Sequence, residues 1–319
     1  MNPFLFGVGC ARSGTTLLQR VLDAHATLAV VNETRWIDRF FEKQIGLDGS
    51  GRVTEALTER LLEHRRFDQL LLSRDDLDQL HRSSGRVPYA TFVSRMFDLY
   101  CVRRGKLLAG DKTPRYVRSI PTLHGLWPHA RFVHLIRDGR DTALSVMSWR
   151  KAHDLAQRFT SWQDDVVGTV ALWWEWQVRL GLESAVSLGS DLYHEVRYEA
   201  LVSNSPGECA DVCGFLGIDY DDTMVRFHVG KIRTDPKLSA KDAWLPPTPA
   251  LRDWRVGMGP DEIEQFEAGA GGLLAELGYE PGVDAVSSTA RARAARTRQA
   301  FVADLQTRGS RLPTAWQSQ

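Results

Sequence analysis

Cysteine is scarce in this sequence, and the four cysteines present are scattered along the chain. In 319 residues they are too few for a disulfide-stabilised scaffold, and their number fits a reducing cytosol. Cys209 and Cys213 are four residues apart on a predicted helix, but no histidine or cysteine pair lies nearby to complete a metal site. We therefore expect Cys10, Cys101, Cys209 and Cys213 to be buried thiols, and we expect no bound metal.

Net charge and long apolar runs are also missing. Forty basic residues balance forty acidic ones, so the whole chain has no attraction to nucleic acid or to an anionic membrane. No stretch approaches the roughly twenty apolar residues of a membrane span, and residues 1–9 have no signal-peptide pattern. The sequence predicts a cytoplasmic protein that binds no nucleic acid, and it leaves the oligomeric state open, a homodimer included.

Short apolar runs alternate with longer segments of helical period. The runs predict strands at 4–9, 28–33, 106–110, 131–137 and 191–198. Such alternation is typical of the α/β class, with a central parallel sheet flanked by helices on both faces. We expect a single domain over 1–284, followed at 285–319 by an extension rich in arginine and alanine. For this extension an added helix, a partner surface and disorder are all open.

Residues 7–16, GVGCARSGTT, have the spacing of a phosphate-binding P-loop but lack its lysine. Thr15 stands where lysine would reach the terminal phosphates of a nucleoside triphosphate. The loop follows an apolar strand and opens a helix, so its backbone N–H groups and the helix dipole favour an anion there. The sheet is therefore expected to be of the P-loop type. The predicted anion-binding residues are Arg12, Ser13, Gly14, Thr15 and Thr16.

A second stretch, RFVHLIRDGRDTALSV (131–146), also ends a strand and begins a helix at the same sheet edge. Arg137 and Ser145 are close enough in sequence to hold one further phosphate together, with Arg140 or Arg150 assisting. Taken alone, an arginine and a serine near a helix start more often provide surface charge and a cap. Together with the lysine-free loop, they predict a nucleotide that carries phosphate groups at both ends.

This combination resembles the sulfotransferases that use 3′-phosphoadenosine 5′-phosphosulfate (PAPS) and release adenosine 3′,5′-bisphosphate. PAPS has no β,γ-phosphate pair and its transfer needs no metal, which agrees with the missing lysine. From about residue 5 to 280 the chain is similar, in order, to protein-tyrosine sulfotransferases and their bacterial relatives. The similar stretches are ARSGTTLLQRVLDAH, NETRW, GDKTP, IRDGRD, VRYEALV, VCGFLGI and the late DWR.

The resemblance implies in-line transfer of a sulfonyl group to a hydroxyl. Glu33 matches the catalytic glutamate, which would be the base, and Lys112 matches a lysine that stabilises the leaving group. Arg12 would add a second positive charge at the phosphosulfate bridge. Without the resemblance, Glu33 would be a charge at a helix N-terminus and Lys112 a surface lysine. None of the nine histidines has a comparable motif.

On the nucleotide side, Tyr198 matches a tyrosine that contacts the cosubstrate, and a core aromatic is an equal alternative. Trp254 and Arg255 would close over the adenine and the 3′-phosphate, unless Trp254 anchors its loop in the core. One more phosphate donor would come from the irregular segment before them, whose candidates are Lys231, Arg233, Lys237 and Lys241.

On the acceptor side, the resemblance places Arg35, Trp36 and Arg39 at the pocket, where such arginines in tyrosine sulfotransferases bind acidic residues beside the target tyrosine. The acceptor would be a small molecule or a peptide whose hydroxyl belongs to a phenol, a sugar or lipid, or a peptidyl tyrosine.

Two other functions compete with sulfuryl transfer. A P-loop kinase or NTPase would require lysine at position 15 and an acidic magnesium ligand. A non-catalytic nucleotide-binding scaffold would require neither Glu33 nor Lys112.

Overall fold

A five-stranded parallel sheet forms the centre of the protein in the computed structural model, which describes residues 2–148, 158–229 and 252–317. All five predicted strands are present. Their order across the sheet is β2-β3-β1-β4-β5, and every neighbouring pair is parallel. The strands are β1 (Leu5–Gly9), β2 (Leu28–Asn32), β3 (Leu108–Lys112), β4 (Arg131–Ile136) and β5 (Tyr193–Arg197).

Helices connect the strands and cover the sheet. Four short 3₁₀ helices are η1 (Phe67–Leu70), η2 (Pro114–Arg118), η3 (Thr160–Trp162) and η4 (Asp222–Met224). The α-helices are α1 (Thr15–Ala24), α2 (Ile37–Glu42), α3 (Glu55–Leu62), α4 (Arg74–Ser84), α5 (Tyr89–Arg104), α6 (Ile120–Leu126), α7 (Gly139–Met147), α9 (Val166–Leu188), α10 (Tyr198–Ser203), α11 (Ser205–Leu216), α12 (Trp254–Gly257), α13 (Pro260–Glu276), α14 (Ser288–Thr307) and α15 (Thr314–Gln317).

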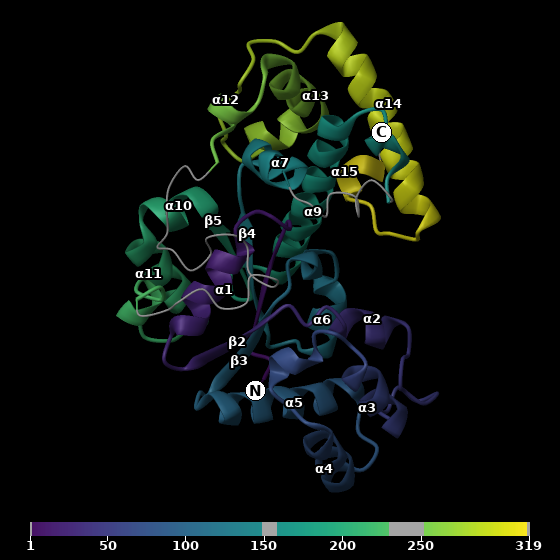
Figure 1. The fold of residues 1–319 in the computed structure, drawn as a ribbon, viewed down its shortest axis with the longest axis vertical. Coiled ribbons are helices and arrows are strands. Elements are labelled where there is room, and N and C mark those ends of the chain that lie inside the picture. Colours follow the sequence, from purple (N-terminus) through teal and green to yellow (C-terminus); the bar gives the residue numbers. More distant parts are fainter. Residues whose placement is uncertain (1, 149–157, 230–251, 318–319) are drawn as a thin grey trace.

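The sheet is buried on both faces, as the apolar strand sequences predict. Phe6 and Val8 of β1 pack into a core cluster with helices from the 36–127 region, whereas Leu5 packs on the opposite face with α1 and α11. In Figure 1 the sheet lies between α2–α6 at one end of the molecule and α12–α15 at the other. The expected α/β fold with helices on both faces is confirmed.

The strand order determines where the loops meet. Because β1 lies between β3 and β4, the loops that follow these strands open side by side at the carboxyl edge of the sheet. Gly9 is in register with Leu135, and Asn32 is in register with Lys112. The register therefore brings the glycine loop next to the 137–145 segment and the end of β2 next to the end of β3.

The extension after residue 284 contains a helix that packs on the rest of the chain. Phe301 of α14 is completely buried and stacks on Phe159, with 4.2 Å between ring centroids. Thr297 donates a hydrogen bond to Asp165 at 2.7 Å, and Arg298 pairs with Glu175 at 2.7 Å. These contacts join α14 to the core around α9 and α13.

No helix in the described ranges is both long enough and apolar enough to cross a membrane.

We expect Phe301→Ala to lower the free energy of unfolding by about 3 kcal/mol, because the change removes a buried aromatic ring and leaves a cavity. Chemical denaturation measures the loss, and Gln299→Ala, an exposed change on the same helix, is the control. Equal stabilities of the two variants would show that α14 does not contribute to the core.

Candidate active site

The glycine loop turns sharply into α1 at Gly14. This residue has φ 93°, and a Cβ added to it would lie 2.4 Å from the ring of Tyr198. The left-handed backbone and the close aromatic ring both require glycine here. As a result, the start of α1, with Thr15 and Thr16, lies against the same tyrosine that follows β5.

The loop is also tied to α7. Ser13 is completely buried, with its hydroxyl 3.4 Å from that of Thr142. Arg12 donates from Nε to the Ser145 hydroxyl at 3.2 Å. The two segments that the sequence analysis assigned to separate phosphates are therefore in direct contact, and the Arg12 guanidinium bridges them.

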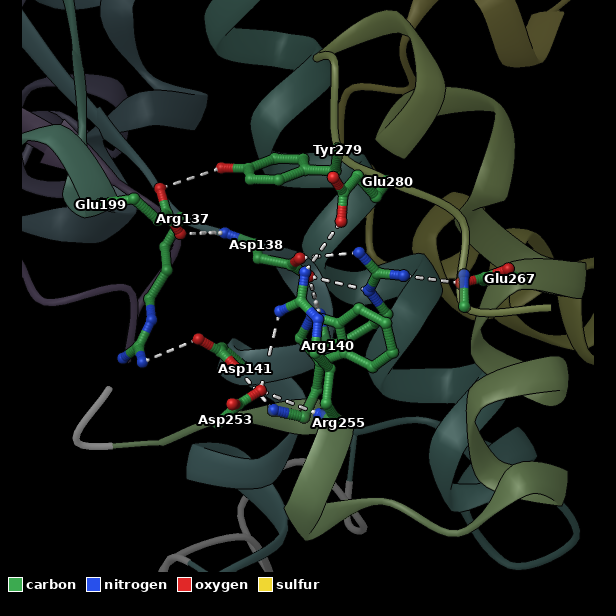
Figure 2. Close-up of polar contacts among 12 residues, drawn as sticks. Arg137, Asp138, Arg140, Asp141, Glu199, Asp253, Arg255, Glu267, Tyr279 and Glu280 are labelled. Atoms are coloured by element: carbon green, nitrogen blue, oxygen red, sulfur yellow. Dashed lines mark hydrogen bonds and ion pairs between the residues drawn. The ribbon is translucent and has the colours of Figure 1, made fainter. Parts of the chain in front are cut away.

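Arg137 lies beside this junction with part of its hydrogen-bonding capacity unused. Its guanidinium stacks over the Tyr198 ring at 4.2 Å and pairs with Asp141 at 3.1 Å, as Figure 2 shows for the latter contact. Its Nε is buried and has no hydrogen-bond partner among the described residues. An unsatisfied buried donor of this kind suits an anionic ligand. The predicted residues Arg12, Ser145 and Arg137 thus gather at one place.

Arg140 does not assist them. It is completely buried, pairs with Asp138 at 2.8 Å and Glu267 at 2.6 Å, and lies 3.6 Å from the centre of the Trp254 ring. Because both carboxylates and the ring already hold its guanidinium, Arg140 anchors α12 and α13 to the start of α7. Trp254 is therefore an anchor, which was one of its two predicted roles.

Arg255 points to the protein surface, where its side chain is 56% exposed and pairs with Glu280 at 3.2 Å. Arg252 lies closer to the anion site. Its backbone oxygen accepts a hydrogen bond from Arg137, and burial together with the charge of Arg252 lowers the pKa of Arg12. No pattern in the sequence distinguished Arg252 from its basic neighbours. The candidate donors Arg150, Lys231, Arg233, Lys237 and Lys241 lie outside the described residues.

The second part of the site lies at the ends of β2 and β3. Lys112 is completely buried, and its Nζ lies 3.1 Å from Oε1 of Glu33. Gly7 leaves room for the lysine, since a Cβ at Gly7 would lie 3.2 Å from Cγ of Lys112. Glu33 also binds Arg35, whose Nε lies 2.7 Å from Oε2, and Arg66, whose Nη2 lies 3.6 Å from the same oxygen.

These cations dominate the electrostatics of the carboxylate. Burial of Glu33 opposes ionisation, but the charges of Lys112, Arg35 and Arg66 outweigh it and lower the pKa of Glu33 to about 2. Burial lowers the pKa of Lys112, while the charge of Glu33 acts in the opposite direction. The carboxylate is therefore fully ionised at neutral pH, with three positive groups around it.

Arg66, which precedes η1, was not predicted. It is only 9% exposed, and its Nε and Nη1 have no hydrogen-bond partner among the described residues. Its position depends on how the 51–82 region folds. The sequence of that region shows a helical period but no motif that predicts a contact with Glu33. Arg66 contacts Glu33, and it adds hydrogen-bond donors that have no partner among the described residues.

The predicted acceptor residues differ in position. Arg35 is partly exposed beside Glu33, and Arg39 is exposed on α2. Trp36 is completely buried in the core and packs against Phe40, with 5.8 Å between ring centroids. A side chain without exposed surface fills the core, so we leave Trp36 out of the proposed acceptor site.

The four cysteines and His134 are buried inside the protein. All four cysteines are buried, and Sγ of Cys213 lies 3.4 Å from Sδ of Met224. His134 is completely buried in β4 and hydrogen bonds to the hydroxyl of Tyr193. Within the part of the chain that the structure describes, no group of histidine, cysteine or acidic side chains has the arrangement of a metal site.

The pKa of Glu33 implies a pH-dependent contribution to stability. Since folding lowers this pKa from 4.5 to about 2, the stabilisation is complete above pH 4.5 and is lost as the pH falls towards 2. We expect Glu33→Gln to cost about 2 to 3 kcal/mol more at pH 7 than at about pH 2. Urea denaturation at both pH values tests this, with the exposed Glu42→Gln as control; a cost that does not change with pH would contradict it.

The chain is similar to known proteins in sequence and in fold. A sequence model of the sulfotransferase family matches residues 3–222. Protein-tyrosine sulfotransferase A of Caenorhabditis elegans is 26% identical over 292 residues, which cover 88% of this chain and 68% of that protein. Nodulation protein NoeE of Sinorhizobium fredii is 28% identical over 300 residues, which cover 86% of this chain and 65% of that protein.

A solved structure shows the same fold. The sulfotransferase domain of the Synechococcus PCC 7002 olefin synthase superposes with a TM-score of 0.59 and 24% identity, over 88% of this chain and 95% of that one. The family match covers the glycine loop, Glu33, Lys112 and the 137–145 segment, which are the residues that the fold brings to one sheet edge. This chain therefore belongs to the sulfotransferase family.

Proposed function

We propose that this chain transfers the sulfonyl group of PAPS to an acceptor hydroxyl and releases adenosine 3′,5′-bisphosphate. The observation that carries the proposal is the meeting of two anion-binding segments, joined by the Arg12–Ser145 hydrogen bond, with the Glu33–Lys112 pair at one sheet edge. Arg137 and Ser145 would bind the 3′-phosphate, and the glycine loop with Arg12 would bind the 5′-phosphosulfate. Tyr198 would pack beside the nucleotide.

In this proposal Glu33 is the general base. It accepts the proton of the acceptor hydroxyl while the acceptor oxygen forms its bond to sulfur. The bond from sulfur to the phosphate oxygen breaks on the opposite side, and that oxygen keeps the electron pair. Lys112 and Arg12 stabilise the negative charge that develops on it.

A carboxylate with a pKa of about 2 is a weak base, so the cations around Glu33 matter for its function. An anionic phosphosulfate would draw the positive charge of Lys112 towards itself and away from Glu33. The pKa of Glu33 would then rise towards the range in which proton transfer is efficient. Cosubstrate binding and activation of the base are therefore coupled through Lys112.

The acceptor side of the proposed site is cationic. Arg35 and Arg66 contact Glu33, and the charges of Arg39 and Arg65 act with them on His64, whose pKa is lowered by burial and by these arginines. An acceptor with a negative group beside its hydroxyl suits this surface. The similarity to protein-tyrosine sulfotransferases favours a phenolic hydroxyl, which is also the more acidic kind of acceptor.

Arg137→Ala tests the 3′-phosphate site. We expect affinity for adenosine 3′,5′-bisphosphate, measured by calorimetry without metal, to fall by about 10- to 100-fold, because charge-assisted hydrogen bonds are lost. Arg226→Ala, an exposed arginine paired with Asp222, is the control and should bind as wild type does. An equal loss of bisphosphate affinity in Arg255→Ala would show that Arg255 also contributes to the 3′-phosphate site.

ATP with magnesium in the same experiment tests the kinase alternative. Binding of ATP–magnesium together with no binding of the bisphosphate would overturn the proposal.

Glu33→Gln tests the base. We expect kcat for transfer of labelled sulfonyl from PAPS to a glutamate-flanked tyrosine peptide to fall by about 10²- to 10⁴-fold. Bisphosphate affinity should persist, since the change removes a negative charge near the anion site. Glu42→Gln is the control. A glutamine variant with wild-type kcat would exclude Glu33 as the base.

A further inference from the structure

The turn after β2 has an unusual backbone. Glu33 has φ 68° and Arg35 has φ 63°, so two residues with side chains adopt the left-handed conformation on either side of Thr34. This conformation is disfavoured for residues other than glycine, and it persists where the surroundings determine it. Because the turn sets the direction of the Glu33 side chain, whatever holds the turn also positions the carboxylate.

A buried network of hydrogen bonds connects the turn to β3 and η2. The hydroxyl of Thr34 donates to Oδ2 of Asp111, and the same hydroxyl lies 2.7 Å from that of Tyr116. The Tyr116 oxygen accepts the backbone N–H of Ile37 at 3.0 Å, and Thr113 donates to Oδ1 of Asp111 at 2.7 Å. Asp111, Thr34, Thr113 and Tyr116 are all completely buried. Two points of the backbone, at Thr34 and Ile37, are thereby fixed to β3 and η2.

The protons of this network have one consistent order. Thr34 has a single hydroxyl proton, which goes to Asp111, so the Tyr116 hydroxyl donates to Thr34 and accepts from the Ile37 N–H. Thr34 and Thr113 then donate directly to the ionised Asp111 carboxylate. The Tyr116 hydroxyl and the Ile37 N–H are satisfied further along the same chain. Burial raises the pKa of Asp111 to about 7, and the hydrogen bonds from Thr34 and Thr113 oppose this rise. The hydroxyl groups of Thr34 and Thr113 therefore favour the charged form of Asp111 against the effect of its burial.

Asp111 and Lys112 are consecutive residues of β3, and side chains at successive strand positions point to opposite faces. Asp111 is in register with Phe6 of the α2–α6 core, and Lys112 is in register with Gly7. The end of one strand thus reaches the Glu33 turn from both faces of the sheet. Lys112 pairs with the carboxylate, while Asp111 holds the backbone that carries it.

We propose that Asp111, Thr34 and Tyr116 are positioning residues, which keep the left-handed 33–35 turn in the conformation that holds the Glu33 carboxylate beside Lys112. The inference rests on the proposed role of Glu33 as base. It assigns to these three residues no contact with either substrate. Their effect is exerted through the direction of Glu33.

Thr34→Val and Tyr116→Phe remove one hydroxyl each with little change of volume. We expect each to lower kcat for transfer from PAPS to the glutamate-flanked tyrosine peptide by about tenfold or more, with bisphosphate affinity within about twofold of wild type. Thr34→Ser, which restores the hydroxyl, should recover kcat. The control Tyr193→Phe removes a buried hydroxyl that bonds to His134 near the β5 edge of the sheet, away from β2 and β3, and it should keep kcat.

The acid limb of the pH profile of kcat distinguishes a positioning role of these residues from a role in protein stability alone. If the turn relaxes, Glu33 moves away from Lys112 and Arg35, and the apparent pKa of the acid limb of kcat should rise in Thr34→Val and Tyr116→Phe. Wild-type kcat in both variants, or equal losses in Tyr193→Phe, would overturn the inference. If either Thr34→Val or Tyr116→Phe fails to fold, kcat of the other variant tests the inference. A Glu33→Gln variant with wild-type kcat would refute the proposed base. If Glu33→Gln loses kcat while Thr34→Val keeps it, only the positioning role is refuted.

A measurement of stability tests the inference without any acceptor. The pH-dependent cost of Glu33→Gln should be smaller in the Thr34→Val background than in wild type, because the carboxylate is then less well placed among its cations. An unchanged cost would show that the network does not position Glu33.

Discussion

The Glu33–Lys112 ion pair is the interaction on which the site depends. It joins the ends of β2 and β3 in a buried position, where an unpaired charge would be strongly destabilising. Arg35 and Arg66 share the same carboxylate, so positive charge exceeds negative charge around it. A low-dielectric edge with an excess of cations favours the binding of anions. On our proposal, the protonation state of Glu33 then depends on which anion is bound.

The sheet order makes this arrangement possible. With β1 between β3 and β4, the glycine loop lies between the Glu33–Lys112 pair on one side and the 137–145 segment on the other. Arg12 belongs to the middle loop and contacts Ser145, while the charge of Glu33 also acts on it. One arginine thus connects the two parts of the site. On our proposal, this position lets a single cation respond to both the nucleotide and the reacting group.

The features set by local sequence were predictable, and those set by tertiary packing were not. Buried parallel strands are nearly continuous apolar runs, so all five were found. The glycine turn into α1 was likewise visible in the sequence, and it is the basis of the predicted anion site. Trp36 and Arg140 were expected at ligand sites. Trp36 is instead buried in a core cluster whose members range from Phe6 to Tyr193, and Arg140 pairs with Glu267. Arg66 and Arg252 were missed for the same reason, since their proximity to the site depends on packing that carries no local pattern.

The account's central claim is that this sheet edge binds a nucleotide through two separate phosphate groups. The most direct test is calorimetric titration of the wild-type protein, without metal, with adenosine 3′,5′-bisphosphate and with adenosine 5′-phosphate. The account predicts that losing the 3′-phosphate weakens binding by about 100-fold, which corresponds to about 2.7 kcal/mol of charge-assisted hydrogen bonding. Equal affinities for the two nucleotides would contradict it.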